Sequence, residues 1–357
     1  MALVAKPTIA DVARRAGVSK GLVSFALNDR PGVSAETRLR ILEVADEMGW
    51  RPSVRARALS SDRAYALGLV LARDPDIIAG DPFFPAFISG IESVLAPAGQ
   101  ALVLSMVESE EAESLSYRQL ADHGRVDGVI ISDLRAGDTR IALVAELGLR
   151  AVTLGTPDAP SPFPAITVDD AAGIRASVSH LVSLGHSRIA HVGGPATMLH
   201  GSRRRDSFRL AMREFGLADD ATIETDFSAA AGAEATRRLL DRAERPTAIV
   251  YANDPMAIAG LGIARRAGLD VPGDLSITGF DGSDIGRYVH PTLTTVSTTA
   301  RQWGVTAAAA LLRLIDREEV ADIDLEPAQL VVRDSTAPPR TSDRGNAAVP
   351  THEGERT

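Results

Sequence analysis

The chain has 357 residues, of which 45% are hydrophobic and only 4% aromatic, and it contains seven histidines and no cysteine. This length and apolar content predict two or three domains with large cores, and the lack of cysteine excludes disulfides and thiolate metal sites. The histidines have no ligand-like spacing, no apolar run approaches the ~20 residues of a membrane span, and the first residues lack a signal-peptide pattern, so we expect a cytoplasmic protein with no metal, cofactor or membrane partner.

The charge is unevenly distributed along the chain. Residues 1–63 contain 11 Lys and Arg against 7 Asp and Glu, a net charge of +4, although the whole chain carries −9. The remaining residues therefore carry −13. A basic end on an acidic body is expected when one end binds phosphate groups and the rest must stay in solution.

Two short helical patterns, separated by one glycine, begin at residue 8. Thr8 and Asp11 form a capping-box pattern, which favours the start of a helix. Apolar residues follow at positions i, i+3, i+4 and i+7 of this helix, namely Ile9, Val12, Ala13 and Ala16. Gly17 supplies the left-handed conformation that ends a helix, and Ser19 is a favourable N-cap for the next one.

The second helix faces the first with its apolar residues and leaves its other side exposed. The apolar residues are Val23, Ala26 and Leu27. The exposed ones are Lys20, Gly21, Ser24, Phe25 and Asn28. Two helices joined by a short turn that contains Gly are typical of a helix-turn-helix. A helical bundle without a nucleic-acid role is the alternative, and the positive charge of this end argues against it.

A third helix is needed because neither short helix can bury its apolar stripe alone. Ser34 caps the segment that follows, and its expected apolar stripe is Ile41, Leu42, Ala45 and Met48. A polar and basic stretch comes after Trp50, in which Ser53 can cap a hinge helix over about residues 53–60. A helix of this length is only marginally stable by itself.

From Ala66 onward, short continuous apolar runs alternate with helical patterns. The runs are ALGLVLA, ALVLSM, DGVIIS and RAVTLG, and then AITV, RIAHVGG, TAIVYA and LSITGF. The helical patterns cover residues 86–98, 139–147, 170–184, 204–215, 231–243 and 255–267. This alternation predicts two α/β lobes with doubly wound parallel sheets, the second starting at Ile166, and a ligand cleft between them at the carboxyl ends of the strands. The polar, irregular residues 338–357 are expected to be disordered.

Six stretches of the chain carry motifs in a recognisable order. They are TIADVARRAGVSKGLVSFALN, GVSAETRLRILEVADEMGWRPS, ARAL, HLVSLGHSRIAHVGG, NDPMAIAGL and VPGDLSITGFD. In this order, over roughly residues 8–335, the chain resembles the lactose-repressor family of bacterial transcription regulators. The resemblance implies a helix-turn-helix headpiece with a hinge helix, over residues 1–63, and a core similar to periplasmic sugar-binding proteins, over residues 64–337.

The same resemblance implies how the core is divided and what the protein does. The first lobe would comprise residues 64–165 and 292–323, and the second lobe residues 166–291 and 324–337. The protein would be a homodimeric repressor that binds a pseudo-palindromic operator. A small effector, a sugar or a sugar derivative, would bind between the lobes and control the affinity for DNA.

The resemblance also implies which residues contact DNA. Those at base-reading positions are Lys20, Gly21 and Phe25. Those at phosphate-contacting positions are Thr8, Ser19, Ser24, Asn28 and Ser34, of which Thr8, Ser19 and Ser34 also serve as helix caps. Phe25 stands where an arginine is common and can pack on a thymine methyl. In ARAL, Arg57 and Leu59 match DNA-contacting positions, and Leu59 would wedge into the minor groove; packing of Leu59 on the core is the alternative.

Five residues of the core match effector-contacting positions, namely Phe84, Arg204, Phe227, Asn253 and Asp281. The two rings would stack on a sugar or base face. The cation, amide and carboxylate would converge from separate strand ends on a ligand with many hydroxyl groups. Each has a plainer alternative: Phe84 in the apolar core, Arg204 on the surface between two other arginines, and Asp281 as the cap of a turn.

Other classes of function fit the sequence less well. An enzyme is disfavoured because VGGP is not a nucleotide-binding motif and no nucleophile–base pair stands out. A free solute-binding protein would need a signal peptide and no DNA reader. The sequence leaves open whether the regulator represses or activates, and which effector it binds.

Overall fold

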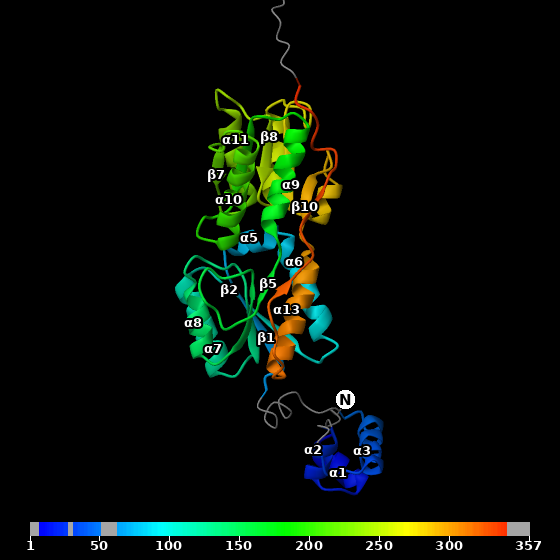
Figure 1. Ribbon diagram of the computed structural model, residues 1–357. Helices are drawn as coiled ribbons and strands as arrows, with labels where there is room; N and C mark the ends of the chain where they lie inside the picture. The colour runs from blue at the N-terminus through cyan, green and yellow to red at the C-terminus, as the bar shows by residue number, and fades with distance from the viewer. Residues whose placement is uncertain (1–6, 28–30, 51–62, 341–357) are drawn as a thin grey trace, which may run out of the picture. The chain divides into compact units, whose positions relative to one another are not determined.

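The computed structural model describes residues 7–27, 31–50 and 63–340, which fall into two compact units, the first ending at Tyr65 and the second beginning at Ala66 (Figure 1). Asn28, Arg57 and Leu59 lie outside the described residues, as does the expected hinge helix over residues 53–60. The roles expected for them therefore stay predictions. None of the helices in the described ranges is long and apolar enough to cross a membrane.

The first unit is a three-helix headpiece. Its helices are α1 (Ile9–Ala16), α2 (Lys20–Leu27) and α3 (Ala35–Glu47). Asp11 accepts hydrogen bonds from the backbone N–H and the hydroxyl of Thr8, at 3.0 and 2.7 Å, as the capping-box pattern predicts. Gly17 has φ +66° at the end of α1, and the Ser19 hydroxyl accepts from the Leu22 N–H at 3.2 Å. The local sequence signals thus place both helices of the helix-turn-helix correctly.

One residue of the expected headpiece core lies on the surface. Leu42 is 42% exposed, whereas Ile41 and Ala45 are buried and Val44 packs against them. The reason is helical geometry, since the face through Ile41 continues at 44, 45 and 48, and residue 42 is turned about 100° away from it. The expectation that Leu42 joins the core is therefore wrong.

The second unit contains two six-stranded sheets, one in each lobe, which confirms the α/β architecture (Figure 1). The first sheet has the order β11-β5-β4-β3-β1-β2 and comprises β1 (Ala66–Ala72), β2 (Ala101–Val107), β3 (Gly128–Ile131), β4 (Arg150–Leu154), β5 (Ala165–Thr167) and β11 (Ile323–Asp324). The second has the order β12-β10-β9-β8-β6-β7 and comprises β6 (Ile189–Gly193), β7 (Thr222–Glu224), β8 (Ala248–Tyr251), β9 (Ser276–Asp281), β10 (Thr294–Ser297) and β12 (Gln329–Val331). All pairings are parallel except that of β12 with β10.

Helices cover both faces of each sheet, as buried parallel strands require. The first lobe holds α5 (Pro75–Gly80), α6 (Phe83–Leu95), α7 (Glu110–Asp122), α8 (Thr139–Glu146) and α13 (Ala300–Ile315). The second lobe holds α9 (Asp170–Ser183), α10 (Leu199–Glu214), α11 (Ala229–Leu240), α12 (Asp254–Arg266) and the 3₁₀ helix η1 (Asp284–Arg287). The six predicted helical patterns all correspond to helices, with ends that shift by up to five residues.

The chain crosses between the lobes three times, and all three expected lobe limits differ from these crossings, the last by a single residue, since Asp324 belongs to β11 of the first sheet. Residues 165–167, of which the last two were expected to open the second lobe, form β5 in the first sheet. Residues 294–297, expected in the first lobe, form β10 in the second sheet. An apolar strand looks the same in sequence whichever sheet it joins, so the alternation of strands and helices cannot reveal a crossing.

The expectation of disorder from residue 338 onward is wrong for its first three residues. Arg340 forms ion pairs with Asp270 and Asp274, at 2.5 and 3.2 Å. The Ala337 carbonyl accepts hydrogen bonds within the second lobe, including one from the Ser276 hydroxyl at 3.1 Å. Residues 338–340 thus belong to the folded second lobe.

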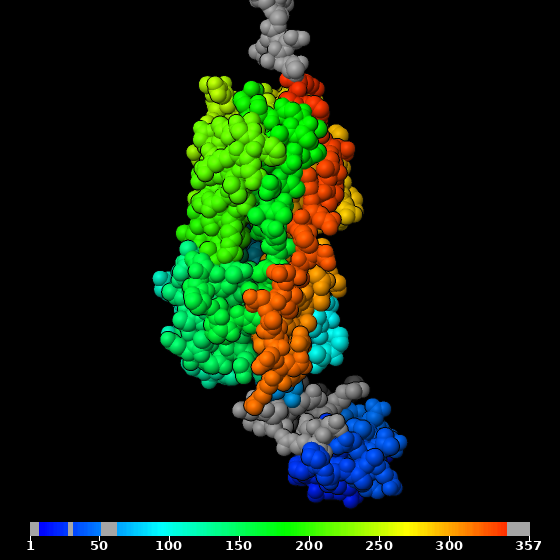
Figure 2. All heavy atoms as spheres, in the orientation of Figure 1, coloured from blue at the N-terminus to red at the C-terminus, as the bar shows by residue number. Residues whose placement is uncertain are grey.

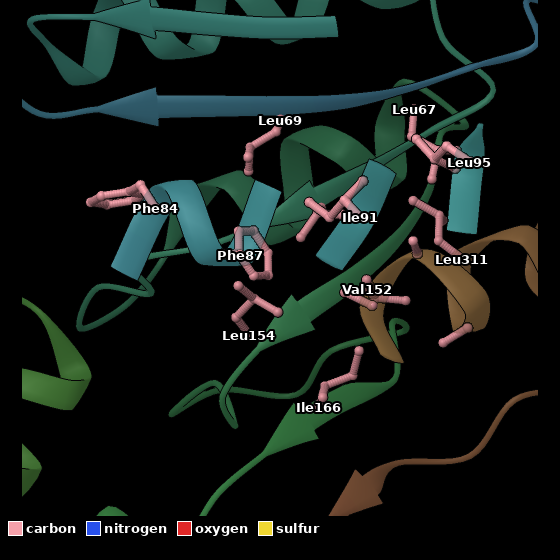
Figure 3. Packing of buried hydrophobic residues seen from close by; sticks show 14 of the residues in the cluster. Leu67, Leu69, Phe84, Phe87, Ile91, Leu95, Val152, Leu154, Ile166 and Leu311 are labelled. Carbon is pink, nitrogen blue, oxygen red and sulfur yellow. The ribbon is translucent and has the colours of Figure 1, made fainter. Parts of the chain in front are cut away.

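In the first lobe, α6 and α13 pack against each other and against one face of the sheet. Figure 3 shows Ile91 and Leu95 of α6 turned toward Val152 of β4 and Leu311 of α13. The approach is close because a glycine stands on each helix: a Cβ on Gly90 would lie 2.1 Å from the Arg301 carbonyl oxygen, and one on Gly304 would lie 2.0 Å from that of Phe87. This packing fixes the N-terminal end of α6, which reaches the lobe interface.

We predict that Gly304→Ala lowers the free energy of unfolding by about 1–3 kcal/mol, because overpacking outweighs the gain of about 1 kcal/mol in helix propensity. Chemical denaturation of the full-length protein measures the change. Gly80→Ala is the matched control, since a Cβ there meets nothing within 4 Å and the backbone is not left-handed. Equal effects of the two substitutions would contradict this account of the helix crossing.

Candidate functional site

A cavity of about 480 Å³ lies between the two lobes, and Figure 2 shows the surface hollowed there. Its walls include residues at the carboxyl ends of β1, β3 and β4 in the first lobe and of β8 and β9 in the second. All five effector positions expected from the sequence line it, namely Phe84, Arg204, Phe227, Asn253 and Asp281. The size lies within the range of about 300–1,000 Å³ that is usual for small-molecule sites.

Arg204 is a buried wall of this cavity and not a surface residue, since only 9% of it is exposed. It does not come from a strand end, as we expected, but from the first half of α10. Its Nε donates to Asp170 at 3.0 Å and its Nη1 to the Ala252 carbonyl at 2.7 Å, while the guanidinium lies over the Phe280 ring. Its nearest contact with Asp281 is longer, at 3.8 Å. Two of its five N–H donors are thus used within the second lobe.

Asn253 has a structural role at the cavity wall. Its Oδ1 accepts from the Met256 N–H at 3.0 Å and so caps α12, and its Nδ2 donates to the Phe227 carbonyl at 2.9 Å. These two bonds hold the loop that carries Phe227, whose backbone is left-handed with φ +72°. Asn253 therefore places the aromatic residue beside the cavity.

Phe227 is already covered on its ring by protein groups. It stacks on His200 with ring centroids 5.1 Å apart, and it is 4% exposed. A Cβ on Gly194 would lie only 1.9 Å from the ring, so the glycine in VGGP makes space for it. In this arrangement, little of the Phe227 ring is left exposed for a ligand to stack on.

Sequence reasoning missed Arg73, which follows strand β1 directly. Its guanidinium makes two hydrogen bonds of 2.6 Å to the Asp133 carboxylate of the same lobe. The guanidinium carbon lies 5.5 Å from the ring centre of Phe84 and 5.3 Å from that of Phe227, so it contacts an aromatic residue of each lobe. Its Nη2 is also 3.5 Å from Nε2 of His200. The sequence feature that could have indicated this role is a single arginine directly after an apolar strand.

Burial controls the ionisation of the groups around the cavity. It raises the pKa of Asp281 well above the ordinary value, and it raises the pKa of Asp81, another carboxylate that lines the cavity. For Asp133, burial also raises the pKa, but Arg73 and other neighbouring basic groups together outweigh it, so that the pKa falls below the usual value. Burial lowers the pKa of His200 to about 3 and keeps its imidazole neutral. No group of three or more His, Asp or Glu in the described parts of the chain is placed to hold a metal ion.

A second candidate site lies on the headpiece. Lys20 and Gly21 are exposed at the start of α2, Phe25 is 41% exposed, and Ser24 is half-buried between them. Ser19 caps α2, and Ser34 caps α3 by accepting from the Thr37 N–H at 3.3 Å. The expected base-reading residues thus share one exposed helix surface.

Comparisons with known proteins find matches for both units of the chain. Residues 8–53 match the model for bacterial regulatory proteins of the lacI family, and residues 178–336 match a periplasmic binding protein-like domain. The HTH-type transcriptional regulator DegA of Bacillus subtilis (strain 168) is 33% identical over 343 residues, which cover 94% of this chain and 100% of that protein.

Two solved structures are similar over most of the chain. A lac repressor dimer bound to operator and the anti-inducer ONPF has a TM-score of 0.81 at 30% identity, covering 93% of this chain and 100% of that one. A complex of the transcriptional regulator CelR with cellobiose has a TM-score of 0.70 at 29% identity, covering 92% of this chain and 99% of that one.

The neutral His200 predicts a specific loss of stability in acid. An unfolded histidine takes up a proton below pH ~6.5, whereas folded His200 stays neutral down to about 3, so the stability that it contributes is lost as the pH falls through this window. We expect up to about 2 kcal/mol of loss from this residue between pH 6.5 and 5. Urea denaturation at several pH values should therefore show a shallower acid slope in His200→Gln.

His123→Gln, at an exposed position after α7, is the control and should keep the slope of the parent protein. The buried His191 titrates in the same direction and remains in both variants. Parallel pH profiles for His200→Gln and the parent would refute the neutral imidazole.

Proposed function

Because the chain belongs to the lacI family of bacterial regulatory proteins, we propose that it binds a pseudo-palindromic operator as a homodimer, and that a carbohydrate in the inter-lobe cavity controls this binding. The broader function follows from family membership: the protein is a DNA-binding transcription regulator and not an enzyme. The cytoplasm, where an operator is accessible, is the compartment that we propose for it.

The proposed operator contacts rest on the exposed surface of α2. In a helix-turn-helix, the N-terminal residues of the second helix lie at base edges in the major groove. Lys20 can donate to guanine O6 or N7, the bare backbone of Gly21 permits close approach, and Phe25 offers an apolar contact to a thymine methyl. Ser19 and Thr8 lie at helix N-termini, where free N–H groups attract phosphate.

The proposed homodimer follows from the amount of sequence that one headpiece can read. A single helix-turn-helix contacts only a few base pairs, whereas specific binding requires about 4–10 kcal/mol over non-specific DNA. Two headpieces on two half-sites supply this difference. A relative is a dimer on its operator, which supports the same assembly here.

The proposed effector site rests on one observation above all. Five residues that are spread over 197 positions of the chain, from Phe84 to Asp281, line a single cavity between the lobes. Carboxylate, guanidinium and aromatic groups together suit a ligand with hydroxyl groups on an apolar ring. The relative CelR binds cellobiose, which supports a carbohydrate as the class of effector.

We predict that Lys20→Ala and Phe25→Ala change which operator is preferred, by about 1–3 kcal/mol at the base pair that each contacts. Ser24→Ala, at a phosphate-contacting position, should weaken binding to all sequences alike. Selection from a randomised operator library, followed by fluorescence anisotropy, measures both effects. Identical sequence preferences for the parent and the Lys20 and Phe25 variants would exclude these residues as readers.

We predict that Asp281→Asn abolishes the response to effector while operator binding by the free protein stays within about threefold of the parent. The substitution keeps the size of the side chain and removes the charge that accepts ligand hydroxyls. A thermal-shift screen of mono- and disaccharides identifies the ligand, and calorimetry then compares the variants. Asp219→Asn, on the surface beside Arg213, is the control. Unchanged affinity in Asp281→Asn would remove this residue from the site.

A further inference from the structure

The cavity between the lobes carries more negative than positive groups. Six carboxylates line it, against three guanidiniums and the neutral His200. Two of the guanidiniums are already paired, Arg73 with Asp133 and Arg204 with Asp170. The third, on Arg203, donates to the Thr156 carbonyl at 2.6 Å. A ligand that enters the cavity therefore meets excess negative charge.

Among the carboxylates that line the cavity, Asp81 and Asp281 are the two that are largely buried and have no close cation of their own. Asp81 belongs to the first lobe, is 8% exposed, and accepts from the Phe83 N–H at 2.9 Å, at the start of α6. Asp281 belongs to the second lobe and ends β9, with φ +100°. Its ion-pair contact with Arg204 is long, at 3.8 Å. Each lobe thus presents one such carboxylate.

The charged groups around this pair come from several elements. Asp81 experiences Arg73 and Asp133 from its own lobe and Arg204 from α10. Asp281 experiences Arg204, and also Asp254 and Asp170 from the starts of α12 and α9. The negative charge of Asp81 also raises the pKa of Asp281. The nearby cations do not outweigh burial at either position.

Four residues that line the cavity also carry a buried polar atom with no hydrogen-bond partner among the described residues. The atoms are Ser132 Oγ, Asp170 Oδ1, Thr298 Oγ1 and Trp303 Nε1. Ser132 and Thr298 are only 5% and 4% exposed, so water at the protein surface does not satisfy them. An unsatisfied buried polar atom is costly, and a bound ligand is the usual partner when such atoms surround a cavity.

We propose that the effector is a neutral polyhydroxyl compound whose hydroxyl groups donate to Asp81 and Asp281, one carboxylate from each lobe, and that this pair excludes phosphorylated and carboxylated sugars. This inference rests on the proposed function, and it further specifies that the effector carries no charge. It also assigns Asp81 as the residue that determines this specificity.

The hydrogen-bonding groups of the cavity distinguish a hydroxyl from the alternatives. A phosphate or carboxylate only accepts hydrogen bonds, so it would leave the carboxylates unsatisfied and add to the negative charge. An ammonium only donates, so it would leave Trp303 Nε1 without an acceptor. A hydroxyl group both donates and accepts, and several of them on one ring can satisfy the carboxylates and the indole together.

This arrangement makes effector binding depend on pH with a defined sign. The ligand hydroxyls donate to the ionised carboxylates, so protonation of Asp81 or Asp281 competes with binding. Because both groups have a raised pKa, effector affinity falls as the solution is acidified through that pKa, by up to tenfold per pH unit for each proton taken up. Binding in this range releases protons.

The experiment screens the full-length protein by thermal shift at pH 7.5 against neutral mono- and disaccharides, including glucose and cellobiose, and against glucose 6-phosphate, glucuronate and glucosamine. We expect a neutral sugar to raise the melting temperature and its charged counterparts to have no effect. Calorimetry in two buffers of different ionisation enthalpy should then show proton release. A screen in which only a charged sugar binds, or no neutral sugar binds, overturns the proposal.

Asp81→Asn tests the carboxylate without any ligand. The Asn side-chain oxygen can still accept from the Phe83 N–H, so the start of α6 keeps this hydrogen bond. Because a raised pKa means that the ionised form opposes folding, the variant should melt ~2–4 °C higher than the parent at pH 7.5, and this difference should vanish near pH 4. Asp219→Asn, which does not line the cavity, should show no such pH-dependent gain. A lower melting temperature for Asp81→Asn at pH 7.5 would contradict the proposal.

With the ligand, Asp81→Asn should bind the neutral sugar at least tenfold more weakly and should release fewer protons, because Asp281 remains in the variant. Anisotropy with operator DNA separates this inference from the proposed function. A neutral sugar that binds as expected but leaves operator affinity unchanged contradicts effector control alone. A phosphorylated sugar that controls operator affinity contradicts the charge selectivity alone.

Discussion

The ion pair between Arg73 and Asp133 is the interaction on which the inter-lobe cavity depends. Both side chains are largely buried, and the bidentate geometry compensates charges that would otherwise be costly in that position. Loss of either partner would leave an unpaired buried charge, at a cost of about 3–5 kcal/mol. The guanidinium also contacts Phe84 of the first lobe and Phe227 of the second, so the same ion pair helps to fix the position of one lobe against the other.

The groups around this pair are placed by close backbone approach. The absence of a Cβ on Gly90 and Gly304 lets α6 and α13 pack tightly, which fixes the start of α6, where Asp81 and Phe84 lie. Gly194 does the same in the second lobe, because it makes room for the Phe227 ring. The cavity is therefore lined by side chains whose backbones cannot easily shift, which favours a preorganised site.

Local patterns predicted the elements well, and tertiary contacts explain the differences. The caps at Thr8, Ser19 and Ser34 and the turn at Gly17 depend on neighbours within four residues, so the sequence alone placed them. The sheet to which β5 and β10 belong depends on distant segments, whereas the exposure of Leu42 follows from the helical period, which turns residue 42 away from the buried face.

The residues of the cavity also divide into those that the sequence predicted and those that only the folded structure identified. The resemblance to a family located five of its residues, but Arg73 and Asp81 had no signal beyond a single charge after a strand or before a helix. Their importance arises only when the fold brings a partner from the other lobe close to them. For Arg204 and Asn253, position in the chain indicated the cavity, whereas the hydrogen bonds that occupy them became evident only in three dimensions.

A ligand in this cavity can act on the arrangement of the lobes because it contacts both of them and the segments that join them. Asp169 follows the crossing after β5 and Thr298 the crossing after β10, and both residues line the cavity. A ligand shifts a conformational equilibrium only as far as its affinity differs between the two states. A site with one carboxylate from each lobe meets this condition, since separation of the lobes would break half of its contacts. By reciprocity, an operator that favours one arrangement of the lobes must change effector affinity by the same factor.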